Sequence, residues 1–156
     1  GDQLDAQDDF EEAKKIIDTN FTGIVSLLNL ISNDFERRRS GFIVGISSVA
    51  GERGRKSNYI YGSSKAAFST YLSGLRARLN FANVHVLTVK PGYVETSMIK
   101  GLNLPKILIA TAEDTAKLIY SAQQKKRNIV YIKTIWRLII LIIKSIPEWK
   151  FKGMSV

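Results

Sequence analysis

Three side chains in the middle of the chain have the types and spacing needed for acid/base chemistry. Tyr61 and Lys65 are four residues apart, and Ser48 lies thirteen residues before the tyrosine. A helix places positions i and i+4 on one face, so the phenol and the ammonium are predicted to lie side by side. A nearby cation favours phenolate and lowers the pKa of a tyrosine. The pair therefore indicates a proton donor and acceptor suited to an alcohol–carbonyl pair.

A buried strand and the helix after it must position these groups. The run Gly41 to Gly51 predicts a strand over 42–47 that leads into a glycine-marked loop, and Tyr61 lies at the start of a predicted helix over 60–80. Open α/β sheets place their chemistry at the carboxyl edge of parallel strands, where Ser48 is expected to meet the helix. The alternative is an ordinary solvent-facing helix with a partly buried tyrosine.

Helix and strand alternate along the rest of the chain. Apolar residues recur at three- and four-residue steps from Phe10 to Phe35, which predicts one long helix over 9–35. Thr111 with Asp114 is typical of a capping box. The other predicted elements are a helix over 112–124 and strands over 84–89 and 129–132. This alternation favours an α/β fold with a doubly wound parallel sheet between helices, a three-layer Rossmann-like arrangement.

Four motifs follow one another in a familiar order. Asn20 lies in Asp-Thr-Asn-Phe-Thr-Gly, Ser48 precedes Tyr61 by thirteen residues, and Tyr61 with Lys65 forms Tyr-x-x-x-Lys. The fourth motif is Pro-Gly-Tyr-Val-Glu-Thr at residues 91–96. Together they resemble the classical short-chain dehydrogenase/reductase family, whose motifs have this order and spacing. The resemblance runs from residue 1 to about residue 132.

The resemblance implies a role for each of these residues. Tyr61 is expected to donate a proton to a substrate carbonyl, Ser48 to bind the same oxygen, and Lys65 to lower the tyrosine pKa and hold the cofactor ribose. Asn20 is expected to hold a water that relays protons towards Lys65. The residues expected at the nicotinamide end of the cofactor are Pro91, Gly92, Val94 and Thr96. Residues 97–110 are the expected substrate lid.

Two family motifs are not found in the sequence. The glycine-rich turn that holds the cofactor pyrophosphate is missing, and so is Asn-Asn-Ala-Gly. A family member has roughly 250 residues in one domain, and this chain has 156. We therefore expect residues 1–132 to be the C-terminal part of a Rossmann-fold catalytic domain, followed by a basic extension at 133–156. The cofactor is expected to be NAD or NADP, with NADP favoured.

The tail is predicted to be an interfacial helix. Its longest apolar run, Leu138 to Ile143, is far shorter than the roughly twenty residues of a membrane span. Trp136, Trp149 and Phe151 lie among lysines and arginines, which predicts peripheral contact of residues 133–152 with an anionic membrane. The alternative is a helix that closes the substrate pocket or packs in a dimer.

The tail also narrows the resemblance. A basic, tryptophan-containing apolar helix ending in Ile-Pro, after an Asn-Ile-Val-Tyr strand, is similar to the decaprenylphosphoryl-2-keto-ribose reductases and related bacterial enzymes. That resemblance implies a lipid-linked sugar substrate at the cytoplasmic membrane face and, as in the family generally, a homo-oligomer, either a dimer or a tetramer. The alternatives are a soluble reductase of ketoacyl or small carbonyl substrates, and a non-catalytic membrane-associated binding protein.

Composition excludes several other classes of site. The chain has no cysteine, which excludes disulfides and thiolate catalysis and fits a reducing cytoplasm. Its single histidine, His85, lies in an apolar run and is expected in a strand, and one histidine cannot build a metal site. Of the net charge of +9, +7 lies within residues 125–156. We expect no nucleic-acid partner, because that segment has no base-reading motif.

Overall fold

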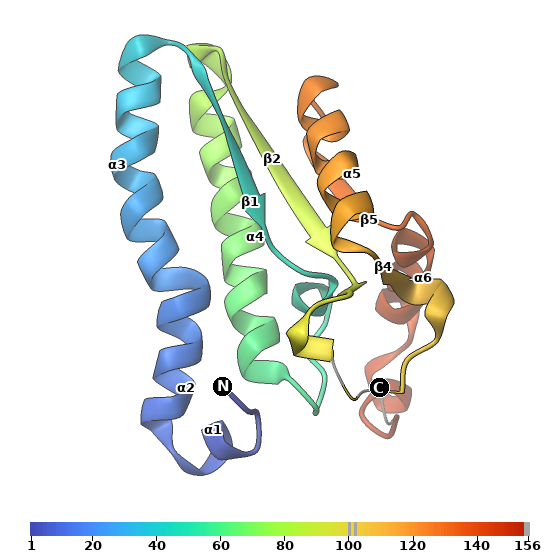
Figure 1. Cartoon of the computed structure of the whole chain (residues 1–156). Helices are drawn as coiled ribbons and strands as arrows, with labels where there is room; N and C mark the ends of the chain where they lie inside the picture. The colour runs from blue at the N-terminus through green and yellow to red at the C-terminus, as the bar shows by residue number, and fades with distance from the viewer. Residues whose placement is uncertain (100, 102, 155–156) are drawn as a thin grey trace.

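The computed structural model describes residues 1–99, 101 and 103–154. Within them, the main sheet has three parallel strands in the order β1 (Gly41–Ile46), β2 (Val84–Pro91) and β5 (Ile129–Ile132). A smaller parallel pair, β3 (Tyr93–Val94) and β4 (Ile109–Ala110), follows β2. In Figure 1, α3 and α4 cover one side of β1 and β2, and α5 lies on the other. The predicted α/β fold with a parallel sheet is confirmed.

The helices include the two predicted over 60–80 and 112–124, each within one residue of its predicted bounds. They are α1 (Asp5–Asp8), α2 (Phe10–Ile17), α3 (Gly23–Arg38), α4 (Tyr59–Leu79), α5 (Ala112–Gln124), α6 (Ile135–Ser145) and α7 (Glu148–Phe151). The short turns are η1 (Asp18–Thr22), η2 (Val49–Glu52), η3 (Asn80–Ala82), η4 (Ser97–Ile99) and η5 (Lys106–Leu108). Helix α5 starts as predicted, because the Thr111 hydroxyl accepts a hydrogen bond from the Asp114 backbone N–H at 3.0 Å.

Alternation along β2 divides the core between the two faces of the sheet. Val84 and Val86 pack with Phe68, Leu72 and Leu79 of α4. Leu87 and Val89 point to the other face and pack with Ala122 and Ile119 of α5. Successive strand side chains point to opposite faces, so one apolar strand supplies both halves of the core. His85 lies in this strand, as predicted.

The helix predicted over 9–35 is confirmed as a helical run from Phe10 to Arg38, but its hydrogen-bond pattern changes in the middle. A π-helical turn, η1, separates α2 from α3. The predicted apolar stripe breaks at its start, since Phe10 is 74% exposed while Ala13 and Ile16 are buried. A π turn inserts a residue into the helix and shifts the face that follows. This turn carries Asn20 and packs against α4.

The aromatic residues of the tail lie mostly inside the fold. Trp136 is 4% exposed and Phe151 is 8% exposed, so their predicted place at a membrane surface is wrong, whereas Trp149 is 69% exposed. The Trp136 indole lies over Gly92, where an added Cβ would be 2.0 Å from the ring. Among residues 1–99, 101 and 103–154, no helix has the length and hydropathy needed to cross a bilayer.

The close contact between η2 and α4 predicts an unequal response to alanine at two glycines. A Cβ at Gly51 would lie 2.7 Å from the backbone nitrogen of Ala66, whereas nothing lies within 4 Å of one at Gly74. We expect Gly51→Ala to lower the free energy of unfolding by about 1–3 kcal/mol, because a helix backbone cannot move aside. Gly74→Ala in mid-helix should raise it by about 1 kcal/mol. Urea denaturation measures both, and equal effects of the two substitutions would contradict the contact.

Candidate active site

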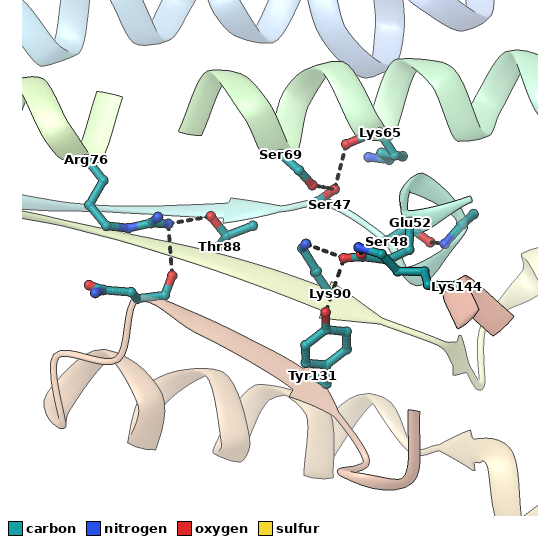
Figure 2. Close-up of polar contacts among 12 residues, drawn as sticks. Ser47, Ser48, Glu52, Lys65, Ser69, Arg76, Thr88, Lys90, Tyr131 and Lys144 are labelled. Carbon is teal, nitrogen blue, oxygen red and sulfur yellow. Dashed lines mark hydrogen bonds and ion pairs between the residues drawn. The ribbon is translucent and has the colours of Figure 1, made fainter. Parts of the chain in front are cut away.

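Ser48 lies directly beyond the carboxyl end of β1 and caps η2. Its hydroxyl accepts a hydrogen bond from the Ala50 backbone N–H at 3.1 Å. The buried Ser47 anchors the turn on both sides, because its N–H donates to the Val89 carbonyl at 2.8 Å and its hydroxyl donates to the Lys65 carbonyl at 2.9 Å. Figure 2 shows Ser47 reaching α4 while Ser48 continues into the turn.

Two glycines let the serine turn and α4 approach closely. A Cβ at Gly62 of α4 would lie 2.9 Å from the Ala50 carbonyl oxygen of η2. In the other direction, a Cβ at Gly51 of η2 would lie 2.7 Å from the Ala66 backbone nitrogen of α4. This approach brings the Ser48 hydroxyl near the Tyr61 phenol, where it acts to lower the pKa of that phenol. Two hydroxyls that lie near each other at a sheet edge can bind one carbonyl oxygen together.

Lys65 completes this cluster from one turn further along α4. Its side chain is buried, and its ammonium donates to the Ile46 carbonyl at 3.2 Å. The same nitrogen lies 5.7 Å from the centroid of the Tyr61 ring. Burial lowers the pKa of Lys65. The structure therefore brings Ser48, Tyr61 and Lys65 together at the carboxyl edge of β1.

The pKa of Tyr61 differs from the prediction in its direction. Burial raises the pKa of the phenol, and the hydrogen bond with Ser48 only partly opposes that rise. The prediction that Lys65 lowers this pKa is wrong for this arrangement, because the ammonium bonds the Ile46 carbonyl and lies beside the ring. Tyr61 is consequently protonated at neutral pH, which is the form that donates a proton.

Asn20 lies on the π turn that packs against α4. Its amide nitrogen donates to the Ile16 carbonyl at 2.9 Å, so the side chain is tied to its own helix. Turns of this kind are frequent at functional sites. A water held by Asn20 that relays protons towards Lys65 stays a prediction.

The segment from Pro91 to Thr96 follows the next strand of the same sheet. Pro91 ends β2 opposite Ile132, and Val94 pairs with Ala110. Gly92 lies under the Trp136 indole. Of the four predicted residues, Thr96 borders an open cavity of about 600 Å³. The residues around that cavity are Glu95, Thr96, Ser97, Ile99, Lys106, Ile109 and Thr111.

The predicted lid over residues 97–110 forms one wall of this cavity. Its described part contains η4, η5 and β4. Residues 100 and 102 lie outside the described residues. Movement of this segment stays a prediction.

The residues present fit one half of a nicotinamide dinucleotide. The buried Lys65 ammonium can donate to ribose hydroxyls, and the cavity at Thr96 has room for a nicotinamide ring. The pyrophosphate half needs a glycine-rich turn between a strand and a helix, and these 156 residues contain none. The chain therefore supplies the chemical end of such a site.

Comparison with known proteins identifies the family. A family model described as short chain dehydrogenase matches residues 2–106, which include Asn20, Ser48, Tyr61, Lys65 and the 91–96 segment. The chain belongs to the short-chain dehydrogenase family. The predicted family is confirmed.

Relatives of this short-chain dehydrogenase are similar along its whole length. An uncharacterised oxidoreductase of Mycobacterium tuberculosis strain H37Rv is 32% identical over 154 residues, covering 99% of this chain and 61% of the relative. Another, from Streptomyces coelicolor, is 29% identical over 157 residues and is likewise covered to 61%. The chain thus spans about three fifths of these relatives. Because both are called uncharacterised, the similarity gives the family and not the narrower reductase branch.

Solved structures show the same fold. A short-chain dehydrogenase from Burkholderia cenocepacia, in complex with NADP, superposes with a TM-score of 0.77 at 23% identity, covering 88% of this chain and 56% of that protein. One from Sphingobium yanoikuyae, in complex with NADPH, also gives 0.77, at 20% identity, covering 92% of this chain and 60% of that one. The Rossmann-like fold of this short-chain dehydrogenase is therefore shown.

Sequence reasoning missed a charged cluster at the end of η2. The buried Glu52 carboxylate accepts hydrogen bonds from Lys90 of β2, from the Tyr131 hydroxyl at 3.1 Å and from Lys144 of α6 at 3.1 Å (Figure 2). Burial and the Glu52 charge raise the pKa of Tyr131 to about 12. The partners lie 38 to 92 residues from Glu52, so no local pattern could have indicated them.

The Glu52 cluster predicts a pH dependence of stability. Burial favours the neutral acid, but hydrogen bonds from Lys90 and Lys144 outweigh it, so the pKa of Glu52 is lowered in the fold. A lowered folded pKa stabilises the protein above the unfolded pKa, and this contribution is lost as the pH falls through the folded value. We expect Glu52→Gln to lower the melting temperature at pH 7, with a difference that shrinks below about pH 4.

The matched control for this prediction is Glu113→Gln. Glu113 is exposed and pairs with Lys117 one turn along α5, and an exposed pair of this kind contributes little. Melting curves between pH 3 and pH 8 compare the two variants with the native protein. A pH-independent difference for Glu52→Gln would show that its charge does not stabilise the fold.

Proposed function

We propose that the protein reduces a carbonyl group to an alcohol, or oxidises the alcohol, with NAD or NADP as the partner in hydride transfer. The approach of the Ser48 turn to Tyr61 at the carboxyl edge of β1, with the buried Lys65 ammonium 5.7 Å from the centroid of the Tyr61 ring, carries this proposal. Membership of the short-chain dehydrogenase family supports it.

Each residue has a role that follows from its surroundings. Bound reduced nicotinamide supplies hydride. Tyr61, whose raised pKa keeps the phenol protonated at neutral pH, donates its proton to the substrate carbonyl oxygen. Ser48 donates a hydrogen bond to the same oxygen as negative charge develops there. Lys65 holds the ribose hydroxyls, and Asn20 holds the water that returns a proton towards it. Oxidation needs the phenolate, so it is favoured only at higher pH.

NADP is the preferred cofactor in this proposal. The two structurally similar dehydrogenases from Burkholderia cenocepacia and Sphingobium yanoikuyae are in complex with NADP and NADPH. Pro91, Gly92, Val94 and Thr96 would form the wall at the nicotinamide end. Comparing KM for NADPH and NADH tests the preference.

The substrate proposal combines the cavity with the tail. The cavity at Thr96 has apolar walls from Ile99 and Ile109 and charged groups from Glu95 and Lys106. We extend the proposal to a membrane-proximal carbonyl, such as a lipid-linked sugar presented at the cytoplasmic membrane face, processed by a homo-oligomer. A ketoacyl substrate is the second candidate, because a 3-oxoacyl-[acyl-carrier-protein] reductase of Chlamydia muridarum is 33% identical over 93 residues.

Replacement of the proton donor tests the reaction. We expect Tyr61→Phe, in the protein produced from its complete gene, to reduce kcat for carbonyl reduction by at least about 100-fold, since general acid catalysis contributes that much. NADPH oxidation followed at 340 nm measures it. Tyr59→Phe, on the exposed start of the same helix, is the control and should keep native activity. Retention of more than about a tenth of kcat by Tyr61→Phe would exclude this assignment.

The outer face of α6 supports the membrane part of the proposal. Leu138, Leu141 and Ile142 are exposed on the side opposite the buried Trp136 and Ile140. Trp149 of α7 is also exposed, with the Lys150 ammonium 5.4 Å from its ring. Apolar and aromatic groups flanked by cations suit the headgroup region of an anionic bilayer.

Vesicle binding tests this part of the proposal independently of catalysis. We expect Leu141→Ser combined with Ile142→Ser to weaken co-sedimentation with phosphatidylglycerol vesicles at least about fivefold, because less apolar area is transferred. Leu30→Ser changes an equally exposed leucine of α3 and should bind as the native protein does. Deletion of the tail is unsuitable, because Trp136 and Phe151 belong to the core. Equal binding of all three proteins would end the membrane proposal.

A further inference from the structure

The turn that carries Ser48 is held between two layers. On one side Gly51 lies against the backbone of α4. On the other side the buried Val49 packs with Trp136 and Ile140 of α6. A 3₁₀ turn this short has few hydrogen bonds of its own, so both layers determine where its serine lies.

Glu52 joins the end of this turn to three other elements. Its carboxylate binds Lys90 of β2, Tyr131 of β5 and Lys144 of α6. A buried carboxylate with several donors is costly to move, because each broken contact leaves a desolvated charge or dipole. The turn is thereby fixed to the C-terminal helix.

Arg53 binds the end of α6 directly. Its guanidinium donates to the carbonyls of Ile143 and Ile146 and to Glu148 at 2.8 Å, and it lies 3.7 Å from the centroid of the Phe151 ring. The last carbonyls of a helix have no partners in the helix, and a cation is favourable there. A planar guanidinium can bridge such groups and stack on a ring, which an ammonium cannot do equally well.

We infer that Arg53 and Glu52 are positioning residues, which use the C-terminal helices α6 and α7 to hold Ser48 against Tyr61. This inference rests on the proposed function, because the position of Ser48 is useful only if Ser48 binds a reacting oxygen. It gives the inner face of the tail a role in the site through Arg53, which lies five residues after the serine. The outer face stays available for a membrane.

Kinetics of Arg53→Ala test the inference. We expect kcat for carbonyl reduction to fall at least about tenfold while KM values for NADPH and substrate stay within about twofold, because a displaced Ser48 weakens binding of the transition state rather than of the ground state. Arg53→Lys should recover only part of kcat. Arg37→Ala, which removes a largely exposed arginine of α3 paired with Asp34, should leave kcat unchanged.

A double-mutant cycle separates positioning from loss of folding. If Arg53 acts through Ser48, Arg53→Ala should cost little once Ser48→Ala is present. Additive losses would overturn the inference, and so would a fall in kcat that matches the unfolded fraction measured by circular dichroism. Native activity of Arg53→Ala beside inactive Tyr61→Phe would overturn the inference alone. Equal activity of Tyr61→Phe and the native protein would overturn the proposed function instead.

Discussion

The close approach of η2 to α4 is the constraint on which the rest of the site depends. Gly51 and Gly62 have no side chain, so the backbones of η2 and α4 are in direct contact at these two positions. Ser48 comes from the turn and Tyr61 and Lys65 come from the helix. The relative position of the three side chains is therefore set by the packing of the turn's backbone against the helix backbone.

Two cations of α4, Lys65 and Arg76, are satisfied mainly by backbone carbonyls. Lys65 bonds the Ile46 carbonyl at the end of β1. Arg76 of α4 donates to the carbonyls of Val86 and Asn128. It also donates to the Thr88 hydroxyl, as Figure 2 shows. A carbonyl offers a cation an acceptor without a full counter-charge. The Ile46 carbonyl therefore gives the Lys65 ammonium an acceptor beside Tyr61, while burial lowers the pKa of Lys65.

The two faces of α6 have different surroundings, because one is buried in the core and the other is exposed. A helix that is apolar on nearly all sides is normally buried or associated with a membrane. Trp136 and Ile140 are buried and pack with residues of β3 and η2. The exposed residues of the helix are Leu138, Leu141 and Ile142. The tail is thus at once a support for the catalytic turn and a candidate membrane surface. The tail's sequence alone left two uses open, a membrane surface and a helix that closes the substrate pocket or packs in a dimer, because cations and aromatics on a short helix fit both.

The sequence alone determined the strands and helices of the sheet and the group Ser48, Tyr61 and Lys65, because periodicity and motif spacing are local properties. Only the tertiary structure decided the direction of the Tyr61 pKa, since it depends on how deeply distant segments bury the phenol. The tertiary structure also decided that Trp136 is buried and that Glu52 binds partners from three other elements. Burial and long-range pairing arise only when remote parts of the chain pack together, and no spacing along the chain encodes them.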